Sequence, residues 1–254
     1  MEGDGGDLEF FEAMSSHRVR GFMRLMRRLP SEPRCSLCRA PYGGLGGKIM
    51  RPLGFGPSRK NPRLCHRCFD EAPEGGIDME VGVLFADVRG FTELSESRPP
   101  GEVAALLNRF YDAAVKVLCR HAIIDKLVGD QVMALYLPRL FDGEVGEHMV
   151  NDARELMAAA DPWIQIGIGL DYGVACVGNV GSGEVKDFTA IGDVVNTAAR
   201  LQGVAGTGEI VVSRRVAGQA LAGAEERTYE LKGKSEPERA LVITPTRSSQ
   251  AAWT

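Results

Sequence analysis

Two aspartates in this sequence stand where a carboxylate can hold a metal ion. Asp87 directly follows Val81-Gly-Val-Leu-Phe-Ala86, a continuous apolar run typical of a buried strand. Asp130 lies at the tip of an expected hairpin, where Gly129-Asp130 joins two apolar runs. If the strands are neighbours, the two carboxylates can share a pair of divalent cations, the usual apparatus for displacement at a phosphorus atom. Either aspartate taken alone is more typical of an ordinary turn than of a metal site.

The residues after Asp87 suit a phosphate group. Gly90-Phe-Thr92 follows the strand as a turn with free backbone N–H groups, and such amides bind anions while the nearby carboxylate holds a metal. We therefore expect Gly90, Phe91 and Thr92 to contact substrate phosphate.

Four of the six cysteines have the spacing of a metal site. Cys35-Ser-Leu-Cys38 and Cys65-His-Arg-Cys68 are separated by 26 residues, and a two-residue spacer lets both sulfurs of a pair face one ion. Structural zinc is the favoured interpretation; an iron or iron–sulfur centre and thiol–disulfide chemistry are the alternatives. The Gly- and Pro-rich segment between the pairs is not expected to form a real apolar core. Cys119 and Cys176 are expected to be plain core residues.

The elements that must position these residues alternate between strands and helices. The order after residue 80 is strand, helix, two strands, helix, strand, which predicts an α+β fold, an α/β sandwich of the ferredoxin-like split βαβ type with a small extension. The expected helices span residues 8–29, 102–120, 147–160 and 193–202. The expected strands span residues 81–86, 123–128, 131–137, 163–170, 174–178, 209–213, 227–231 and 239–243.

Charge divides the 254 residues into two parts. Residues 14–68 hold 13 Lys and Arg against one acid, whereas the whole chain has a net charge of −4. We expect an amphipathic helix in 1–34, a four-cysteine module at 35–75, a larger domain at 76–245 and a tail at 246–254. No apolar run approaches the roughly 18 residues of a membrane span and no secretory signal is visible, so we expect a cytoplasmic protein.

Three blocks of this chain resemble the signature blocks of class III nucleotidyl cyclases. They come in the family's order and at its spacing, and the resemblance runs from about residue 80 to 243. The blocks are Val83-Leu-Phe-Ala-Asp-Val-Arg-Gly-Phe-Thr92, Asp125-Lys-Leu-Val-Gly-Asp-Gln-Val-Met-Ala134 and Asp187-Phe-Thr-Ala-Ile-Gly-Asp-Val-Val-Asn-Thr-Ala-Ala-Arg-Leu201.

The resemblance implies a role for each matching position. It places two Mg²⁺ or Mn²⁺ ions on Asp87 and Asp130, with the backbone of Val88 as a further ligand. It places recognition of the base on Lys126 and Thr189, and transition-state stabilisation on Asn196 and Arg200. A phosphate-contacting lysine falls in Leu231-Lys-Gly-Lys234, at Lys232 in preference to Lys234.

The base-reading pair favours ATP. Lys126 can only donate, which suits the N1 acceptor of adenine, and the Thr189 oxygen can accept from the 6-amino group. Thr is a weaker acceptor than the Asp of the commoner adenylyl pattern. A guanylate cyclase or a dual-specificity cyclase is therefore the alternative within the family.

The resemblance also implies a head-to-tail homodimer with two composite sites, because the metal carboxylates and the base-reading residues serve different sites. A zinc-dependent nucleic-acid-binding or regulatory scaffold is the alternative of another class, since the first 68 residues are basic. The complete set of cyclase residues argues against a silent scaffold, and no obligatory nucleic acid is expected.

Overall fold

The computed structural model describes residues 32–138, 140–160, 164–182, 185–216, 221 and 224–245. The helix expected at 8–29 and the tail lie outside this range. The helical elements are α3 (Gly44–Met50), the 3-10 turn η1 (Arg51–Leu53), α4 (His66–Asp70), α5 (Phe91–Ser97), α6 (Pro100–Leu118), α7 (Val145–Ala159) and α8 (Asp193–Val204). The strands are β1 (Ile77–Val88), β2 (Ile123–Val128), β3 (Gln131–Tyr136), β4 (Ile166–Ser182), β5 (Val185–Ile191), β6 (Ile210–Ser213), β7 (Glu225–Tyr229) and β8 (Glu238–Ile243).

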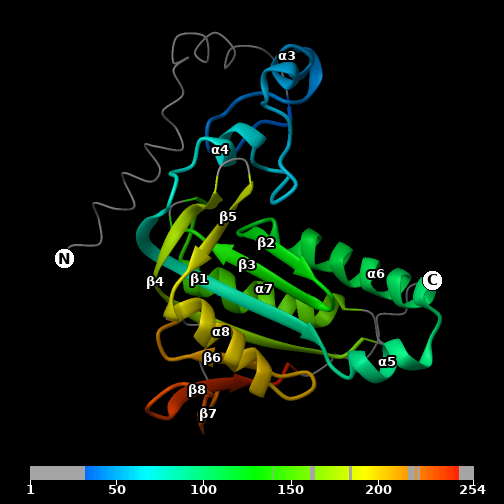
Figure 1. The fold of residues 1–254 in the computed structure, drawn as a ribbon, viewed down its shortest axis with the longest axis vertical. Coiled ribbons are helices and arrows are strands. Elements are labelled where there is room, and N and C mark those ends of the chain that lie inside the picture. The colour runs from blue at the N-terminus through cyan, green and yellow to red at the C-terminus, as the bar shows by residue number, and fades with distance from the viewer. Residues whose placement is uncertain are drawn as a thin grey trace.

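One mixed sheet of eight strands forms the larger part of the molecule (Figure 1). Its order is β2-β3-β1-β4-β6-β8-β7, and β5 pairs with β4 off this path. The long central strands β1 and β4 are antiparallel over twelve registered pairs, from Ile77↔Val177 to Val88↔Ile166. The α+β class and the cyclase-type sandwich expected from the sequence are thereby confirmed.

Helices cover the two faces of the sheet unequally. Along β1 the side chains alternate, so that Leu84 and Ala86 pack with α6 and α7, while Val83 and Phe85 belong to the cluster that includes α8. Helix α8 packs so closely on β4 that a Cβ at Gly169 would overlap the Ala198 carbonyl oxygen. The face beside α8 is left partly open, and the site described below lies there.

The four-cysteine module stands at one end of this sheet, beyond β2 and the β4–β5 hairpin (Figure 1). Its apolar cluster is larger than the sequence predicted, since Met50, Phe55 and Leu64 are all buried and belong to the same cluster as Phe85 of β1. The ring of Phe69 meets Phe188 of β5 edge-on, with centroids 5.0 Å apart. The module is therefore joined to the domain by apolar contact as well as by the chain.

Residues 73–76, which connect the module to the domain, run directly against β4. A Cβ at Gly178 would lie 2.6 Å from the Gly76 Cα, so only glycine fits this close approach. The buried Asn179 side chain donates to the Phe69 carbonyl oxygen at 2.8 Å and to that of Ala72 at 3.1 Å. The junction between the module and the domain is therefore held by specific hydrogen bonds from Asn179.

Three other expectations differ from the structure. The two strands expected at 163–170 and 174–178 form one strand, β4, because pairing with β1 continues through residues 171–173. No strand was expected between residues 179 and 208, yet residues 178–182 of β4 are paired with β5. Cys176, expected in the core, is only partly buried and its thiol donates to the Gly75 carbonyl oxygen at 3.0 Å, whereas Cys119 is buried as expected. Among the described residues, no helix has the length and apolar character needed to cross a membrane.

Candidate active site and four-cysteine cluster

The two candidate metal carboxylates come from adjacent strands. Asp87 of β1 is registered against Gln131 of β3, so Asp130 in the β2–β3 turn lies next to it. The Val88 amide donates to the Asp130 carbonyl oxygen at 3.2 Å, which fixes this turn against β1. Burial raises the pKa of Asp87, and the negative charge of Asp130 raises it further. Two neighbouring carboxylates, one of them partly buried, fit a site for a divalent cation.

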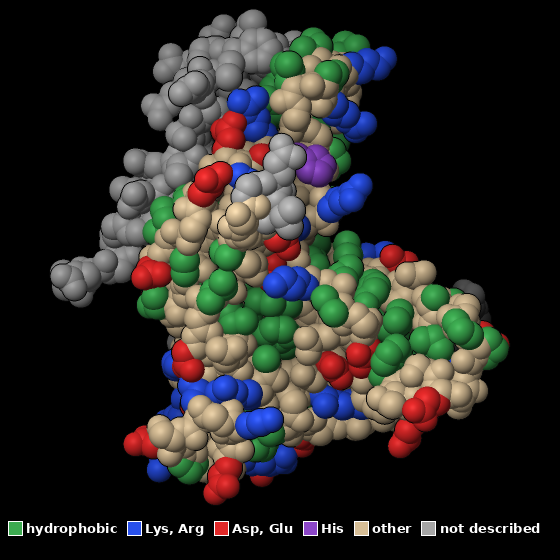
Figure 2. All heavy atoms as spheres, in the orientation of Figure 1, with side chains coloured by type: hydrophobic (Ala, Val, Ile, Leu, Met, Phe, Trp, Pro, Cys, Tyr) green, Lys and Arg blue, Asp and Glu red, His purple; other side chains and the backbone are tan. Residues whose placement is uncertain are grey.

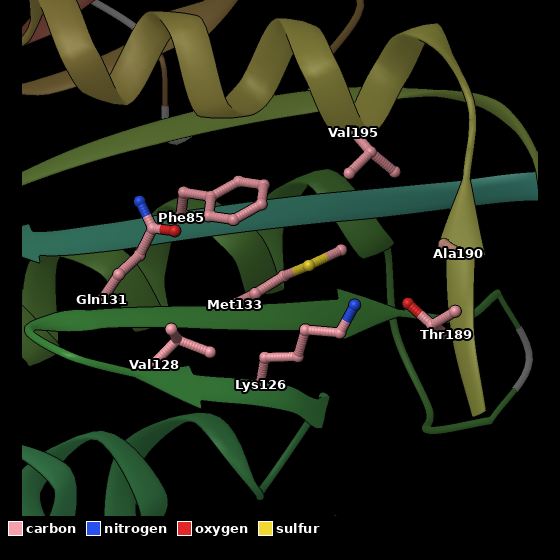
Figure 3. Close-up of a pocket in the computed structure, with 8 residues that line it drawn as sticks. All are labelled: Phe85, Lys126, Val128, Gln131, Met133, Thr189, Ala190 and Val195. Atoms are coloured by element: carbon pink, nitrogen blue, oxygen red, sulfur yellow. The ribbon is translucent and has the colours of Figure 1, made fainter. Parts of the chain in front are cut away.

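A pocket of about 270 Å³ opens on the same face. Figure 3 shows Lys126 of β2 and Thr189 of β5 pointing toward one another across its mouth. Lys126 is exposed, whereas Thr189 is 7 % exposed. The remaining walls are mostly apolar and are formed by Phe85, Val128, Gln131, Met133, Ala190 and Val195. A donor-only ammonium and a hydroxyl beside a flat apolar wall make a site that can hold and read a heterocyclic base.

Asn196 and Arg200 lie one turn apart on α8, as the spacing predicts. Asn196 is exposed and Arg200 is half-buried. The turn between β7 and β8 approaches Arg200, since a Cβ at Gly233 would lie 3.2 Å from its Nη2. Both side chains lie outside the pocket lining, although Val195 belongs to it. The two catalytic candidates therefore lie on the helix that contributes one residue to the pocket wall.

The expected phosphate turn is a left-handed glycine followed by a short helix. Gly90 has φ 70° and serves as the N-cap residue of α5, a conformation that favours glycine. Phe91 is half-buried and Thr92 is exposed. Helix α5 was not expected from the sequence, which indicated only a turn here.

The two lysines of the β7–β8 turn differ in their contacts. Lys234 donates to Asp193 at the start of α8, with Nζ and Oδ2 2.6 Å apart. This ion pair lowers the pKa of Asp193. Lys232 is exposed. The structure therefore gives Lys234 a partner within the chain, and the phosphate contact of Lys232 stays a prediction.

The four cysteines of the module come together. The Sγ atoms of Cys35 and Cys68 are 3.7 Å apart, those of Cys38 and Cys65 are 3.6 Å apart, and all four lie within 4.8 Å of one another. Tetrahedral zinc with Zn–S bonds of about 2.3 Å requires sulfurs about 3.8 Å apart, so the cluster has the size of such a site. All four are buried, and their mutual hydrogen bonds raise the pKa of the Cys65 and Cys68 thiols. A bound cation would remove the cost of bringing the four sulfurs together.

Two residues that the sequence reasoning left out support Thr189 from outside the pocket lining. Asp125 precedes Lys126 and its carboxylate accepts the Thr189 hydroxyl proton, with Oδ2 and Oγ1 2.8 Å apart. Lys60 of the four-cysteine module reaches the same carboxylate. Asp125 carried a signal, since a charged residue within an apolar strand requires a partner; for Lys60 the sequence offered none.

Comparison with known proteins identifies the larger domain. Residues 77–243 match the family model for the adenylate and guanylate cyclase catalytic domain. Among curated proteins, the uncharacterized protein Rv1320c of Mycobacterium tuberculosis is 31% identical over an alignment that covers 94% of this chain and 41% of that protein. The uncharacterized protein Rv1319c of the same organism is 29% identical over 77% of this chain and 35% of its own length. The chain spans less than half the length of these relatives.

Solved structures of both substrate types resemble the domain. The guanylyl cyclase Cya2 superposes with a TM-score of 0.61 and 27% identity, covering 66% of this chain and 93% of that one. The adenylyl cyclase CyaB from P. aeruginosa superposes with a TM-score of 0.59 and 28% identity, covering 65% of this chain and 94% of that one. Each superposition covers about the length of the sheet domain. One of the two proteins is a guanylyl cyclase and the other is an adenylyl cyclase.

Proposed function

Since this chain belongs to the adenylate and guanylate cyclase catalytic domain family, we propose that it converts ATP into 3′,5′-cyclic AMP and pyrophosphate. The observation that carries the choice of ATP is the pocket in which Lys126 and Thr189 face each other. Adenine offers an acceptor at N1 for the ammonium group and an amino group for the threonine oxygen. Guanine presents N–H and C=O at these positions, which is the reverse pattern.

The reaction joins the ribose 3′-oxygen to the α-phosphorus, while the bond from that phosphorus to the pyrophosphate oxygen breaks. The 3′-hydroxyl loses its proton and pyrophosphate leaves with the electron pair. In this proposal Asp87, Asp130 and the Val88 carbonyl hold two Mg²⁺ or Mn²⁺ ions. When bound, these ions lower the pKa of the hydroxyl and neutralise charge on the phosphoryl oxygens.

Side chains of α8 act on the reacting groups. Arg200 donates its planar fork to the α-phosphoryl oxygens, where negative charge develops in the transition state. Asn196 orients the ribose so that its hydroxyl attacks in line. Gly90, Phe91 and Thr92 contact the phosphates through their backbone amides, and Lys232 adds a positive charge at the leaving pyrophosphate.

The proposed enzyme is a head-to-tail homodimer. Strands β2, β4 and β5 expose large apolar side chains: Leu127, Val128, Val174 and Ile191 are 41%, 62%, 61% and 56% exposed, and Val128 also lines the pocket. Figure 2 shows hydrophobic side chains gathered on this face of the sheet domain. A second copy covering them would bury apolar surface and bring its carboxylates to this pocket, so that each dimer holds two composite sites.

Mixing two inactive variants tests the composite site. Asp87→Ala removes a metal ligand and Arg200→Ala removes the transition-state donor, so each homodimer is inactive. A heterodimer contains one site without either change, and an equal mixture regains about a quarter of the wild-type rate because half of the dimers are mixed. Co-refolding or subunit exchange followed by a cyclic nucleotide assay measures this. No recovery, with heterodimers present by mass spectrometry, would contradict the shared site.

The four-cysteine module is proposed to hold structural zinc. Four buried sulfurs at tetrahedral spacing fit this ion, and its binding would fold the segment from residue 32 to 70 around one centre.

Guanylate cyclase activity is the second candidate function, because Thr189 is a weaker acceptor than a carboxylate and Cya2 is a guanylyl cyclase. Competition between ATP and GTP in one assay distinguishes the two.

A further inference from the structure

Lys60 of the four-cysteine module is inserted between the two strands that carry the base-reading residues. Its Nζ atom donates to the Asp125 backbone oxygen at 2.8 Å and to the Phe188 oxygen at 2.9 Å. It also contacts the carboxylates of Asp125 and Asp187, at 3.1 and 2.9 Å. Its backbone oxygen accepts from the Ile124 amide at 2.9 Å. The side chain is 18% exposed, so one lysine of the module ties β2 to β5 directly behind the pocket.

Asp125 connects this lysine to the pocket. Its carboxylate is fully buried, its Oδ1 accepts from Lys60, and its Oδ2 accepts the Thr189 hydroxyl proton at 2.8 Å. A carboxylate accepts hydrogen bonds and a lysine only donates them, so the direction of both bonds is fixed. Because the single proton of Thr189 points to Asp125, only lone pairs of its oxygen remain for the pocket.

We propose that Lys60 and Asp125 are positioning residues that fix Thr189 as a hydrogen-bond acceptor, and thereby select a purine with an amino group at C6 over one with a carbonyl at C6. The inference rests on the proposed cyclase function and deepens it, since it assigns the choice of ATP over GTP to residues that do not contact the nucleotide. It also gives the four-cysteine module a role in substrate selection. A threonine without this support can rotate its hydroxyl proton into the pocket and accept either base.

Asp125→Asn reverses the hydrogen bond without changing the shape of the side chain. Lys60 can only donate, so the amide oxygen of the asparagine must face it and the amide NH₂ must face Thr189. The Thr189 oxygen then accepts this bond, and its proton turns toward the base. We expect the ratio of kcat/KM for ATP to that for GTP to fall about tenfold, equivalent to ~1.4 kcal/mol, while Lys126 retains part of the preference.

A second substitution distinguishes the effect of a reversed hydrogen bond from that of a loss of packing. In Lys60→Met with Asp125→Asn, the amide is free to turn its oxygen to Thr189, so the double variant recovers part of the ATP preference that Asp125→Asn loses. In a Thr189→Val background, Asp125→Asn should change the ratio much less, because no hydroxyl remains to orient and only the 4.0 Å ion pair between Lys126 and Asp125 is altered. Lys48→Met is the matched control, since Lys48 is an exposed lysine of the same module; its ratio should equal that of the wild type.

The same ratios measured by binding separate this inference from the proposed function. Dissociation constants for 3′-deoxy-ATP and 3′-deoxy-GTP, which lack the attacking hydroxyl, report base selection without turnover. A wild-type protein that forms no cyclic nucleotide would contradict the proposed function, yet its binding ratio would still test Asp125. If Asp125→Asn weakens both nucleotides equally, or if the Lys60→Met double variant shows no recovery, the inference is wrong and these residues only support the fold.

Discussion

The sheet domain and the four-cysteine module are held in shape by different means. In the domain, site residues occupy adjacent strands and one helix, so strand pairing places Asp87 beside the turn that carries Asp130. In the module, between residues 32 and 70, the chain gathers around four sulfurs with a small apolar cluster beside them. The proposed catalytic residues thus lie on paired strands and on one helix. Polar side chains of the module, such as Lys60, reach into the domain. In our proposal, the influence of the module depends on how firmly the sulfur cluster fixes them.

The largest effect on activity should come from removing a proposed metal ligand of the sheet domain. Asp130→Ala removes a carboxylate from the proposed metal pair, and we expect cyclic nucleotide formation to fall by at least about a thousandfold, because charge on the phosphoryl oxygens is no longer neutralised. Initial rates with Mg²⁺ and Mn²⁺ measure this. Asp112→Ala, which changes an exposed aspartate of α6, is the control and should keep the wild-type rate. A loss below tenfold for Asp130→Ala would remove it from the metal site.

Disrupting the sulfur cluster should unfold the module first and affect catalysis second. Cys65→Ser is expected to lose the bound metal, to lower the melting temperature, and to lower activity on the order of ten- to a hundredfold, as changes to supporting residues of a site often do. Metal analysis and thermal unfolding measure the first two. Cys176→Ser, outside the cluster, should retain one metal per chain. An unchanged metal content in Cys65→Ser would refute the four-cysteine site.

A second set of hydrogen bonds between the module and the domain, made by Asn61, should matter for stability more than for metal binding. The fully buried Asn61 of the module donates to the carbonyl oxygens of Cys119 and Ala122, at 3.0 and 2.6 Å, at the end of α6. Asn61→Ala leaves both oxygens without this donor, and we expect a loss of about 1–3 kcal/mol in the free energy of unfolding. Denaturant unfolding with metal analysis checks this. An unchanged midpoint would show that the module contributes little to the domain.

A smaller effect of the opposite sign, a gain in stability, is expected when the charge of Asp87 is removed. Burial and Asp130 raise its pKa in the folded protein, so the charged form destabilises the fold at neutral pH when no cation is bound. Asp87→Asn should therefore raise the melting temperature by a few degrees at pH 7.5 in chelator. The gain should vanish as pH falls below the pKa of an unfolded aspartate, about 3.9, where both states are protonated. A lower melting temperature at pH 7.5 would contradict this assignment.

The contrast also explains what the sequence could predict. The strand–helix order, the β2–β3 hairpin and the i, i+4 pair on α8 follow from periodicity and spacing, which are local. The joining of β4 into one strand depends on its pairing with β1, and the apolar cluster of Met50, Phe55 and Leu64 depends on the domain beneath it. Both are tertiary effects that a single segment does not encode.

Among site residues, spacing was informative for the cysteines and family resemblance for the nucleotide residues. The contact from Lys60 to Asp125 joins residues 65 positions apart through a long flexible side chain. No periodicity marks such a pair, and the basic composition of the module does not identify which of its charges meets the domain. The structure was needed to show that one of those charges is directed inward.

The most direct measurement is the product formed by the purified full chain from an equal mixture of ATP and GTP, with Mg²⁺ or Mn²⁺, resolved by chromatography. The account predicts cyclic AMP as the main product, with pyrophosphate released in equal amount. Cyclic GMP as the main product would contradict the base selection assigned to Lys126 and Thr189. No cyclic product from either nucleotide, in a protein that is folded, dimeric and metal-loaded, would contradict the proposed function itself.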